Sequence, residues 1–184
     1  EISACLVGSE MCIRDSDTST LKPNSKGVFT NAIMSFARMM NHILQEQFDN
    51  ILVAFDAGKH TFRHDIMTDY KAGRAHMPEE MRMQIAHIKN LLDLLGVKRY
   101  EVALYEADDI IGTMAKKAEG EGYHVDIYSS DKDLLQLITD NTTVHLTKKG
   151  LTDLEDYTPS HFEEVYGIKV PQFILSLIHI SEPT

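Results

Sequence analysis

The stretch YEADDIIGTMAKKAEGEGYHVDIYSSDKDLLQLI, residues 105–138, decides the fold. Its first half carries apolar residues at helical spacing up to Gly120, which predicts an amphipathic helix. Residues 125–128, VDIY, are expected to form a strand, and a second helical pattern follows over residues 131–138. A helix, a strand and a helix in close succession are typical of a parallel sheet that is covered by helices.

The same alternation continues on both sides of this stretch. Short apolar strands are expected over residues 51–55, 97–104 and 143–146. Helices are expected over residues 28–48 and 81–95, and another begins at Thr158 and Pro159, which suit a cap and a first turn. The pattern predicts an α/β fold of three layers, with a mostly parallel sheet and helices on both faces.

Acidic residues follow three of the expected strands, where ligands bind in folds of this kind. They are Asp56 after the first strand, Glu106, Asp108 and Asp109 after the second, and Asp131 and Asp133 after the third. Carboxylates that share one edge repel one another unless cations hold them together, and oxygen ligands favour Mg²⁺ or Mn²⁺. Paired ions of this type are suited to phosphodiester hydrolysis. The alternative is that each acid only caps a helix and favours its dipole.

Other catalytic patterns are missing from the sequence. No Cys or His pair has zinc-ligand spacing, no Ser lies in a nucleophile elbow, and no Gly-rich phosphate loop precedes a helix. The formal net charge of −10 argues mildly against a nucleic-acid partner, although bound cations would reverse the local field. No apolar run is long enough to span a bilayer, so we expect no membrane partner.

Two stretches near the ends, VGSEMCIRDS at residues 7–16 and LSLIHISEPT at residues 175–184, have a common origin. A single DNA string encodes the first, and its reverse complement encodes the second, so the pair resembles a translated sequencing-library adapter. We therefore predict non-native tails over residues 1–16 and 175–184 around a truncated domain over residues 17–174. Both tails are expected to pack poorly. Because Cys5 and Cys12 lie in the first tail, the domain has no cysteine, which fits a reducing cytoplasm.

Three blocks carry a resemblance to a known family. They are VAFDAGKHTFRHDIMTDYKAGRAHMPEEM at residues 53–81, YEADDIIGTMAKKAEGEGY at residues 105–123 and SSDKDLLQL at residues 129–137. In order and spacing they resemble the 5′ nuclease domain at the N-terminus of bacterial DNA polymerase I. The resemblance covers essentially all of residues 17–174 and implies a PIN-like 5′ nuclease fold. It also implies a structure-specific 5′-3′ exonuclease or flap endonuclease that hydrolyses DNA or RNA-primer phosphodiesters in replication and repair.

The resemblance also implies roles for single residues. Asp56, Glu106, Asp108, Asp109, Asp131 and Asp133 would be metal ligands for two or more Mg²⁺ or Mn²⁺ ions. Lys71 and Arg74 would contact the scissile phosphate, Tyr70 would stack on a base, and Lys59 and Arg63 would contact the DNA backbone. The alternative for the last five residues is an ordinary solvated basic surface.

The chain departs from the family pattern at both ends. The family's first strand, with an Asp in a Leu-Ile-Asp-Gly-like motif, would lie before residue 17 and is expected to be missing. Two further metal-binding Asp residues and a duplex-binding module would follow residue 174 and are also expected to be missing. We therefore expect the fragment itself to be inactive.

The expected partners are DNA with a 5′ flap or a nick and hybrids of an RNA primer with DNA. The intact protein would be a monomer in the bacterial cytoplasm, associated with the nucleoid and fused to a polymerase domain. Three alternatives stay open: a stand-alone flap endonuclease-like protein, a DNA-binding module whose nuclease activity has decayed, and a small PIN-type ribonuclease. Cleavage of a flap DNA compared with a plain RNA strand would separate them.

Overall fold

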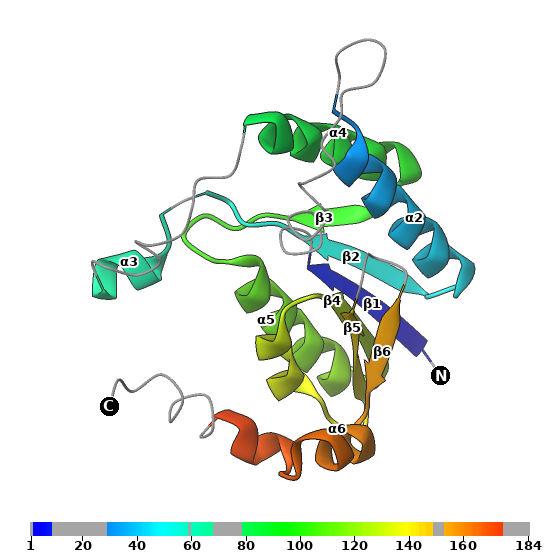
Figure 1. Ribbon diagram of the computed structural model, residues 1–184, viewed down its shortest axis with the longest axis vertical. Coiled ribbons are helices and arrows are strands. Elements are labelled where there is room, and N and C mark those ends of the chain that lie inside the picture. Colours follow the sequence, from blue (N-terminus) through cyan, green and yellow to red (C-terminus); the bar gives the residue numbers. More distant parts are fainter. Residues whose placement is uncertain (1, 9–28, 59, 68–78, 149–152, 175–184) are drawn as a thin grey trace.

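A six-stranded sheet forms the centre of the molecule, in the order β3-β2-β1-β4-β5-β6 (Figure 1). The computed structural model describes residues 2–8, 29–58, 60–67, 79–148 and 153–174. The strands are β1 (Ile2–Gly8), β2 (Asn50–Ala54), β3 (Lys98–Tyr100), β4 (Tyr123–Ser129), β5 (Thr142–Thr147) and β6 (Leu154–Tyr157). Neighbouring strands from β3 to β5 pair in parallel, and only β6 is antiparallel to its neighbour β5.

Helices cover both faces of this sheet (Figure 1). Helices α2 (Asn31–Gln45) and α4 (Glu79–Leu95) lie together on one side. On the other side lie α5 (Ala107–Gly120), the 3-10 helix η2 (Lys132–Leu137) and α6 (Pro159–Tyr166). The short helix α3 (Phe62–Ile66) stands apart from both layers. The three-layer, mostly parallel fold predicted from the sequence is confirmed.

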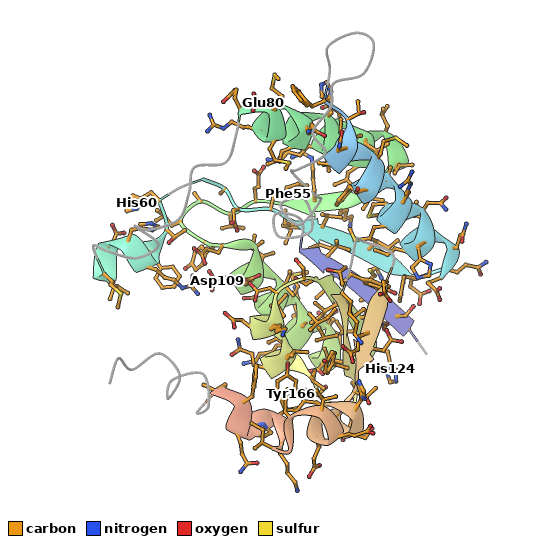
Figure 2. All side chains as sticks on the ribbon, in the orientation of Figure 1. Phe55, His60, Glu80, Asp109, His124 and Tyr166 are labelled. Atoms are coloured by element: carbon orange, nitrogen blue, oxygen red, sulfur yellow. The ribbon has the colours of Figure 1, made fainter. Side chains whose placement is uncertain are left out.

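The two layers of helices enclose separate hydrophobic clusters. Figure 2 shows the side chains that fill the space between the helices and the sheet. Along β2, Val53 packs with the α2 and α4 side, whereas Leu52 and Ala54 pack with the α5 side. Successive residues of a strand point to opposite faces, so a strand that is covered on both faces must be apolar throughout. This explains why β2 appears in the sequence as a continuous apolar run. Among the described residues, no helix is both long and apolar enough to cross a membrane.

The first strand corrects one expectation. Residues 1–16 were expected to pack poorly, but β1 pairs with both β2 and β4 in the middle of the sheet. Since β1 contains no Asp, the absence of the family's first strand with its Leu-Ile-Asp-Gly-like motif stays a prediction. Cys5 and Val7 are fully buried. The seven residues ISACLVG are apolar enough to fill a central position that would otherwise leave the edges of β2 and β4 unpaired. Residues 9–16 and 175–184 lie outside the described residues, and the adapter origin of both tails stays a prediction.

The connection after β3 also differs from the expected strand over residues 97–104. Strand β3 is an edge strand that ends at Tyr100, and the chain continues through an irregular segment to α5. Within this segment Leu104 has a φ of 70°, a left-handed conformation that is costly for a residue with a Cβ atom. The acids of α5 are therefore presented by a bent connection and a helix start, not directly by a strand end.

Candidate active site

The N-terminus of α5 is tied to the carboxyl end of β2. Asp56 follows β2, and its Oδ1 accepts a hydrogen bond of 2.5 Å from the backbone amide of Ala107, in the first turn of α5. Glu106, the residue before the helix, is only 7% exposed. Asp56 thus satisfies one of the amides that a helix start leaves unpaired, and it fixes α5 against the sheet.

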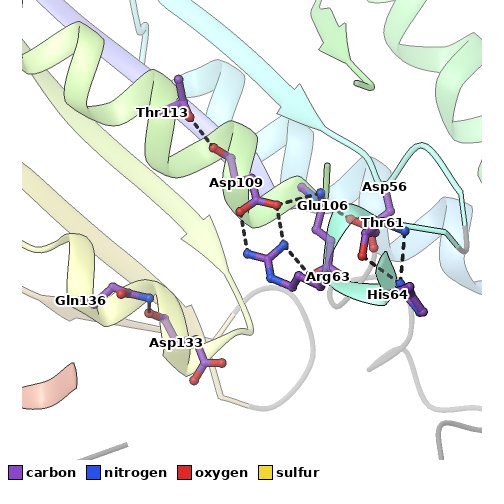
Figure 3. Close-up of polar contacts among 10 residues, drawn as sticks. Asp56, Thr61, Arg63, His64, Glu106, Asp109, Thr113, Asp133 and Gln136 are labelled. Carbon is purple, nitrogen blue, oxygen red and sulfur yellow. Dashed lines mark hydrogen bonds and ion pairs between the residues drawn. The ribbon is translucent and has the colours of Figure 1, made fainter. Parts of the chain in front are cut away.

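Asp109 accepts hydrogen bonds from a side chain and from the backbone, as Figure 3 shows. Arg63 donates to both of its carboxylate oxygens, with Nη1 2.7 Å from Oδ2 and Nη2 2.7 Å from Oδ1. Oδ2 also accepts from the backbone amide of Glu106 at 3.0 Å. The same Nη1 lies 3.6 Å from Oε2 of Glu106. One guanidinium group therefore neutralises charge on two of the predicted metal ligands.

Arg63 reaches these acids because α3 is held against the segment that precedes α5. The backbone amide of Phe62 donates to the carbonyl of Leu104 at 2.9 Å, and Thr61 and Leu104 form an isolated bridge. The guanidinium carbon of Arg63 lies 4.7 Å from the centre of the Phe62 ring, and that ring lies 5.6 Å from the ring of Tyr105. The left-handed backbone at Leu104 is thus part of the contact that positions Arg63.

An open pocket of about 460 Å³ lies between α5 and η2. Four of the six predicted metal ligands line it: Glu106, Asp108 and Asp109 from α5 and the residue before it, and Asp133 from η2. Lys116 and Arg63 bring positive charge to the same pocket. Acids from separate parts of the sequence thus line one pocket, and their role as metal ligands stays a prediction.

Asp56 and Asp131 do not line that pocket. Asp131 precedes η2, where its Oδ1 accepts from the backbone amide of Asp133 at 2.8 Å. Its own amide donates to Oγ of Ser129 at 3.0 Å. The contacts of Asp56 and Asp131 are those of helix caps, the alternative that the sequence left open. Their assignment as metal ligands stays a prediction.

The donor set of the pocket fits a hard divalent cation, because it consists of carboxylates from two helix starts. Within the described parts of the chain, however, no group of three His, Cys, Asp or Glu side chains is arranged to hold one ion. The bidentate contact with Arg63 explains this, since it turns both oxygens of Asp109 toward a guanidinium group. The four predicted ligands line one pocket, but no three of them are arranged around a common point in the described part of the chain.

The other sequence predictions concern basic and aromatic residues. Lys59, Tyr70, Lys71 and Arg74 lie outside the described residues. Arg63 pairs with Asp109 and Glu106 in the structure, and its expected contact with the DNA backbone stays a prediction. The pairing with the two acids was not predicted from the sequence. The signal that could have suggested it is a basic residue in the segment between two acidic blocks.

The comparisons with known proteins agree with this architecture. A family described as "5'-3' exonuclease, N-terminal resolvase-like domain" matches residues 11–167. The chain belongs to this family. It is 49% identical to DNA polymerase I of Bacillus subtilis (strain 168) over 168 residues, which are 91% of this chain and 19% of that protein. It is 44% identical to the thermostable DNA polymerase I of Thermus aquaticus over 149 residues, 81% of this chain and 17% of that protein.

This member of the 5'-3' exonuclease family thus spans less than a fifth of the length of these polymerases. Solved structures support the fold. The T5 D15 protein co-crystallised with metal ions is similar with a TM-score of 0.69 at 22% identity, over 94% of this chain and 64% of that chain. The catalytic core of Rad2 in complex with a DNA substrate has a TM-score of 0.57 at 17% identity, over 95% of this chain and 53% of that chain.

Proposed function

We propose that this chain is the catalytic part of a structure-specific 5′-3′ exonuclease and flap endonuclease that hydrolyses phosphodiesters of DNA or of RNA primers. The observation that carries the proposal is the pocket between α5 and η2, where four carboxylates gather in a chain of the 5'-3' exonuclease family. Its neighbour in fold, the T5 D15 flap endonuclease, is described in a complex with DNA and metal ions.

Glu106, Asp108, Asp109 and Asp133 are the residues that would hold Mg²⁺ or Mn²⁺ in this pocket. When bound, such ions supply hydroxide at neutral pH and stabilise the charge that develops on the phosphate. The chain contributes the rest of the arrangement. Asp56 fixes the start of α5, and Lys116 brings positive charge to the pocket that an entering phosphate group would meet.

Substrate contacts extend this proposal beyond the pocket. Lys71 and Arg74 would act on the scissile phosphate, Tyr70 would stack on a base, and Lys59 would bind the backbone. This assignment rests on the match between their segment and the family's sequence. Asp56 and Asp131 would complete the ligand set, directly or through water.

The biological setting follows from the bacterial relatives. DNA with a 5′ flap or a nick and hybrids of RNA primer with DNA would be the substrates, and two or more Mg²⁺ or Mn²⁺ ions would be the cofactors. The intact protein would be fused to a polymerase domain and would act as a monomer at the bacterial nucleoid, in the cytoplasm. The relatives support this because they are DNA polymerase I proteins of which this chain matches a small part.

The test is cleavage of a labelled 5′-flap DNA in Mg²⁺, in Mn²⁺ and in EDTA. The 184-residue chain is compared with a longer domain in which the genomic sequence on both sides of residues 17–174 is restored. The longer domain should cut the flap only with metal, and the 184-residue chain should cut it at least about a hundredfold more slowly, a loss typical when catalytic contacts are removed.

A matched pair of variants of the longer domain distinguishes the effect of an acid in the pocket from the effect of negative charge elsewhere on the surface. Asp109→Asn should abolish cleavage, while Asp140→Asn, an exposed acid outside the pocket, should not change it. If the longer domain binds flap DNA without cutting it, it is a decayed binding module. If it cuts plain RNA strands in preference to flaps, it is a ribonuclease.

A further inference from the structure

Arg63 saturates most of the hydrogen-bonding capacity of Asp109. A carboxylate offers about four lone-pair positions. The two guanidinium contacts and the amide of Glu106 occupy three of those positions on Asp109. A cation that binds Asp109 through both oxygens would therefore have to replace part of this contact, and any cation at Asp109 would approach a positive charge.

Neighbouring groups fix the position of the guanidinium group of Arg63. Arg63 is 31% exposed and Asp109 is 22% exposed, so the pair is partly shielded from water. The Phe62 ring lies under the guanidinium group, and the bond from Phe62 to Leu104 holds the backbone of α3 (Figure 3, where Arg63 points at Asp109). An arginine has a defined position when its guanidinium group stacks on a ring and its two Nη atoms donate to the same carboxylate.

We propose that Arg63 is a positioning residue that substitutes for the metal: it clamps Asp109 and Glu106 in the metal-free protein and must release Asp109 when a divalent cation binds. This inference rests on the proposed function, because it takes the pocket to be a metal site. Removal of Arg63 should then have opposite effects on the two states. It should destabilise the metal-free fold and strengthen metal binding.

The expected sizes follow from simple electrostatics. Loss of one positive charge beside a divalent ion, at a partly exposed site, should raise the affinity for Mn²⁺ about three- to tenfold. A residue that only supported the structure of the pocket would have the opposite effect, because its loss would disorder Asp109 and weaken binding.

The experiment is a titration of the 184-residue chain with Mn²⁺, with free Mn²⁺ measured by electron paramagnetic resonance. Arg63→Gln is compared with the wild type and with Arg63→Lys, which keeps the charge but loses the fork. Arg82→Gln is the matched control, since Arg82 pairs with Glu79 at the exposed start of α4 and does not line the pocket. The affinity should rise in Arg63→Gln, stay near the wild-type value in Arg82→Gln, and rise less in Arg63→Lys.

Thermal unfolding gives a second readout that does not need activity. In EDTA, Arg63→Gln should unfold several degrees below the wild type, and saturating Mn²⁺ should raise its Tm by more than it raises that of the wild type. If Mn²⁺ restores the Tm that Arg63→Gln loses, the metal ion has replaced the positive charge of the guanidinium group.

The outcomes separate the inference from the function on which it rests. One result would contradict the role of Arg63 but keep the metal site: the wild type binds Mn²⁺, Asp109→Asn weakens this binding, and Arg63→Gln leaves it unchanged or weakens it. If the wild type does not bind Mn²⁺, or binds it equally well as Asp109→Asn, the metal site itself is wrong and the clamp falls with it.

Discussion

The starts of α5 and η2 have the same local pattern in the sequence, a strand followed by acids that open a helix, yet they differ in the structure. At α5 the acids meet a cation, because Arg63 bonds both oxygens of Asp109. At η2, Asp131 accepts from the amide of Asp133. Acids cap both helix starts, since Asp109 also accepts from the amide of Glu106. The difference is the bidentate ion pair at α5, which concentrates charge that a metal could take over.

The difference comes from helix α3, which is not part of the sequence pattern at either helix start. Helix α3 lies more than forty residues before α5 in the chain and is brought to it by the bond between Phe62 and Leu104. Where such a segment supplies a cation, an acid cluster can be stable without metal. At η2, Asp131 has the hydrogen bonds of a helix cap.

The largest effect should come from neutralising the clamped acid. Asp109→Asn should lower the free energy of unfolding in EDTA by about 2 kcal/mol, because it breaks a bidentate ion pair and leaves Arg63 partly buried without its partner. Asp131→Asn should change it by less than about 0.5 kcal/mol, since Asn is as good a cap as Asp. Chemical denaturation of both variants measures the contrast.

Equal effects of Asp109→Asn and Asp131→Asn would show that the two helix starts do not differ in the way described. A double-mutant cycle with Arg63→Gln serves as the control, because the clamp requires that the two losses are not additive.

A second test uses a carboxylate pair that is clamped by a titratable group. The ring of His145 lies between Asp126, 2.8 Å from Nε2, and Asp156, 2.6 Å from Nδ1, and it stacks on Tyr128 at 4.4 Å. Burial lowers the pKa of His145, but the hydrogen bonds to Asp126 and Asp156 outweigh it, so the pKa lies above its ordinary value of 6.5.

A raised pKa in the folded state means that the stabilisation is complete below pH 6.5 and is lost as the pH rises through the folded-state pKa. The free energy of unfolding should therefore fall by on the order of 1 kcal/mol as the pH is raised from about 6 to about 9. His145→Gln should remove this contribution, while Arg63→Gln should not, since arginine keeps its charge throughout this range. An unchanged slope in His145→Gln would contradict the assignment.

The smallest effect concerns the backbone that joins α3 to α5. Leu104 has a φ of 70° and is 47% exposed, so its side chain contributes little burial to offset the strain. Leu104→Gly should raise the free energy of unfolding by about 0.5 kcal/mol. This value is the strain energy that glycine relieves minus the cost of the greater flexibility that it gives the unfolded chain. Leu104→Ala keeps the strain and should not be stabilising. A loss of stability in Leu104→Gly would show that its side chain supports α3.

The sequence predicted the parts of the molecule that depend on near neighbours. The helix of α5, the buried strands and the acids that open α5 and η2 could be predicted because periodicity and capping act within a few residues. Glu106, Asp108, Asp109 and Asp133 line one pocket, but Asp56 and Asp131, which were expected at the same edge, do not. The reason is that an irregular segment separates β3 from α5, so the rule that parallel strands end at one edge does not place the acids of α5.

The parts that failed depend on distant segments. The contact of Arg63 with Asp109 spans 46 residues and depends on a left-handed residue that no local pattern marks. The poor packing predicted for residues 1–16 rests on the DNA string that encodes residues 7–16. The place of β1 in the sheet depends instead on its apolar residues and on the gap between β2 and β4. The edge strand β6 and the helix α3 were missed because both are short and carry few apolar residues.

The central claim is that the divalent cation binds at the start of α5, and paramagnetic broadening by Mn²⁺ in NMR spectra of the backbone amides tests it most directly. At low Mn²⁺ the signals of Glu106, Asp108, Asp109 and Asp133 should broaden first, and those near Asp126, His145 and Asp156 should stay sharp. Broadening that is centred on Asp126 and Asp156, or spread evenly over exposed acids, would contradict the account.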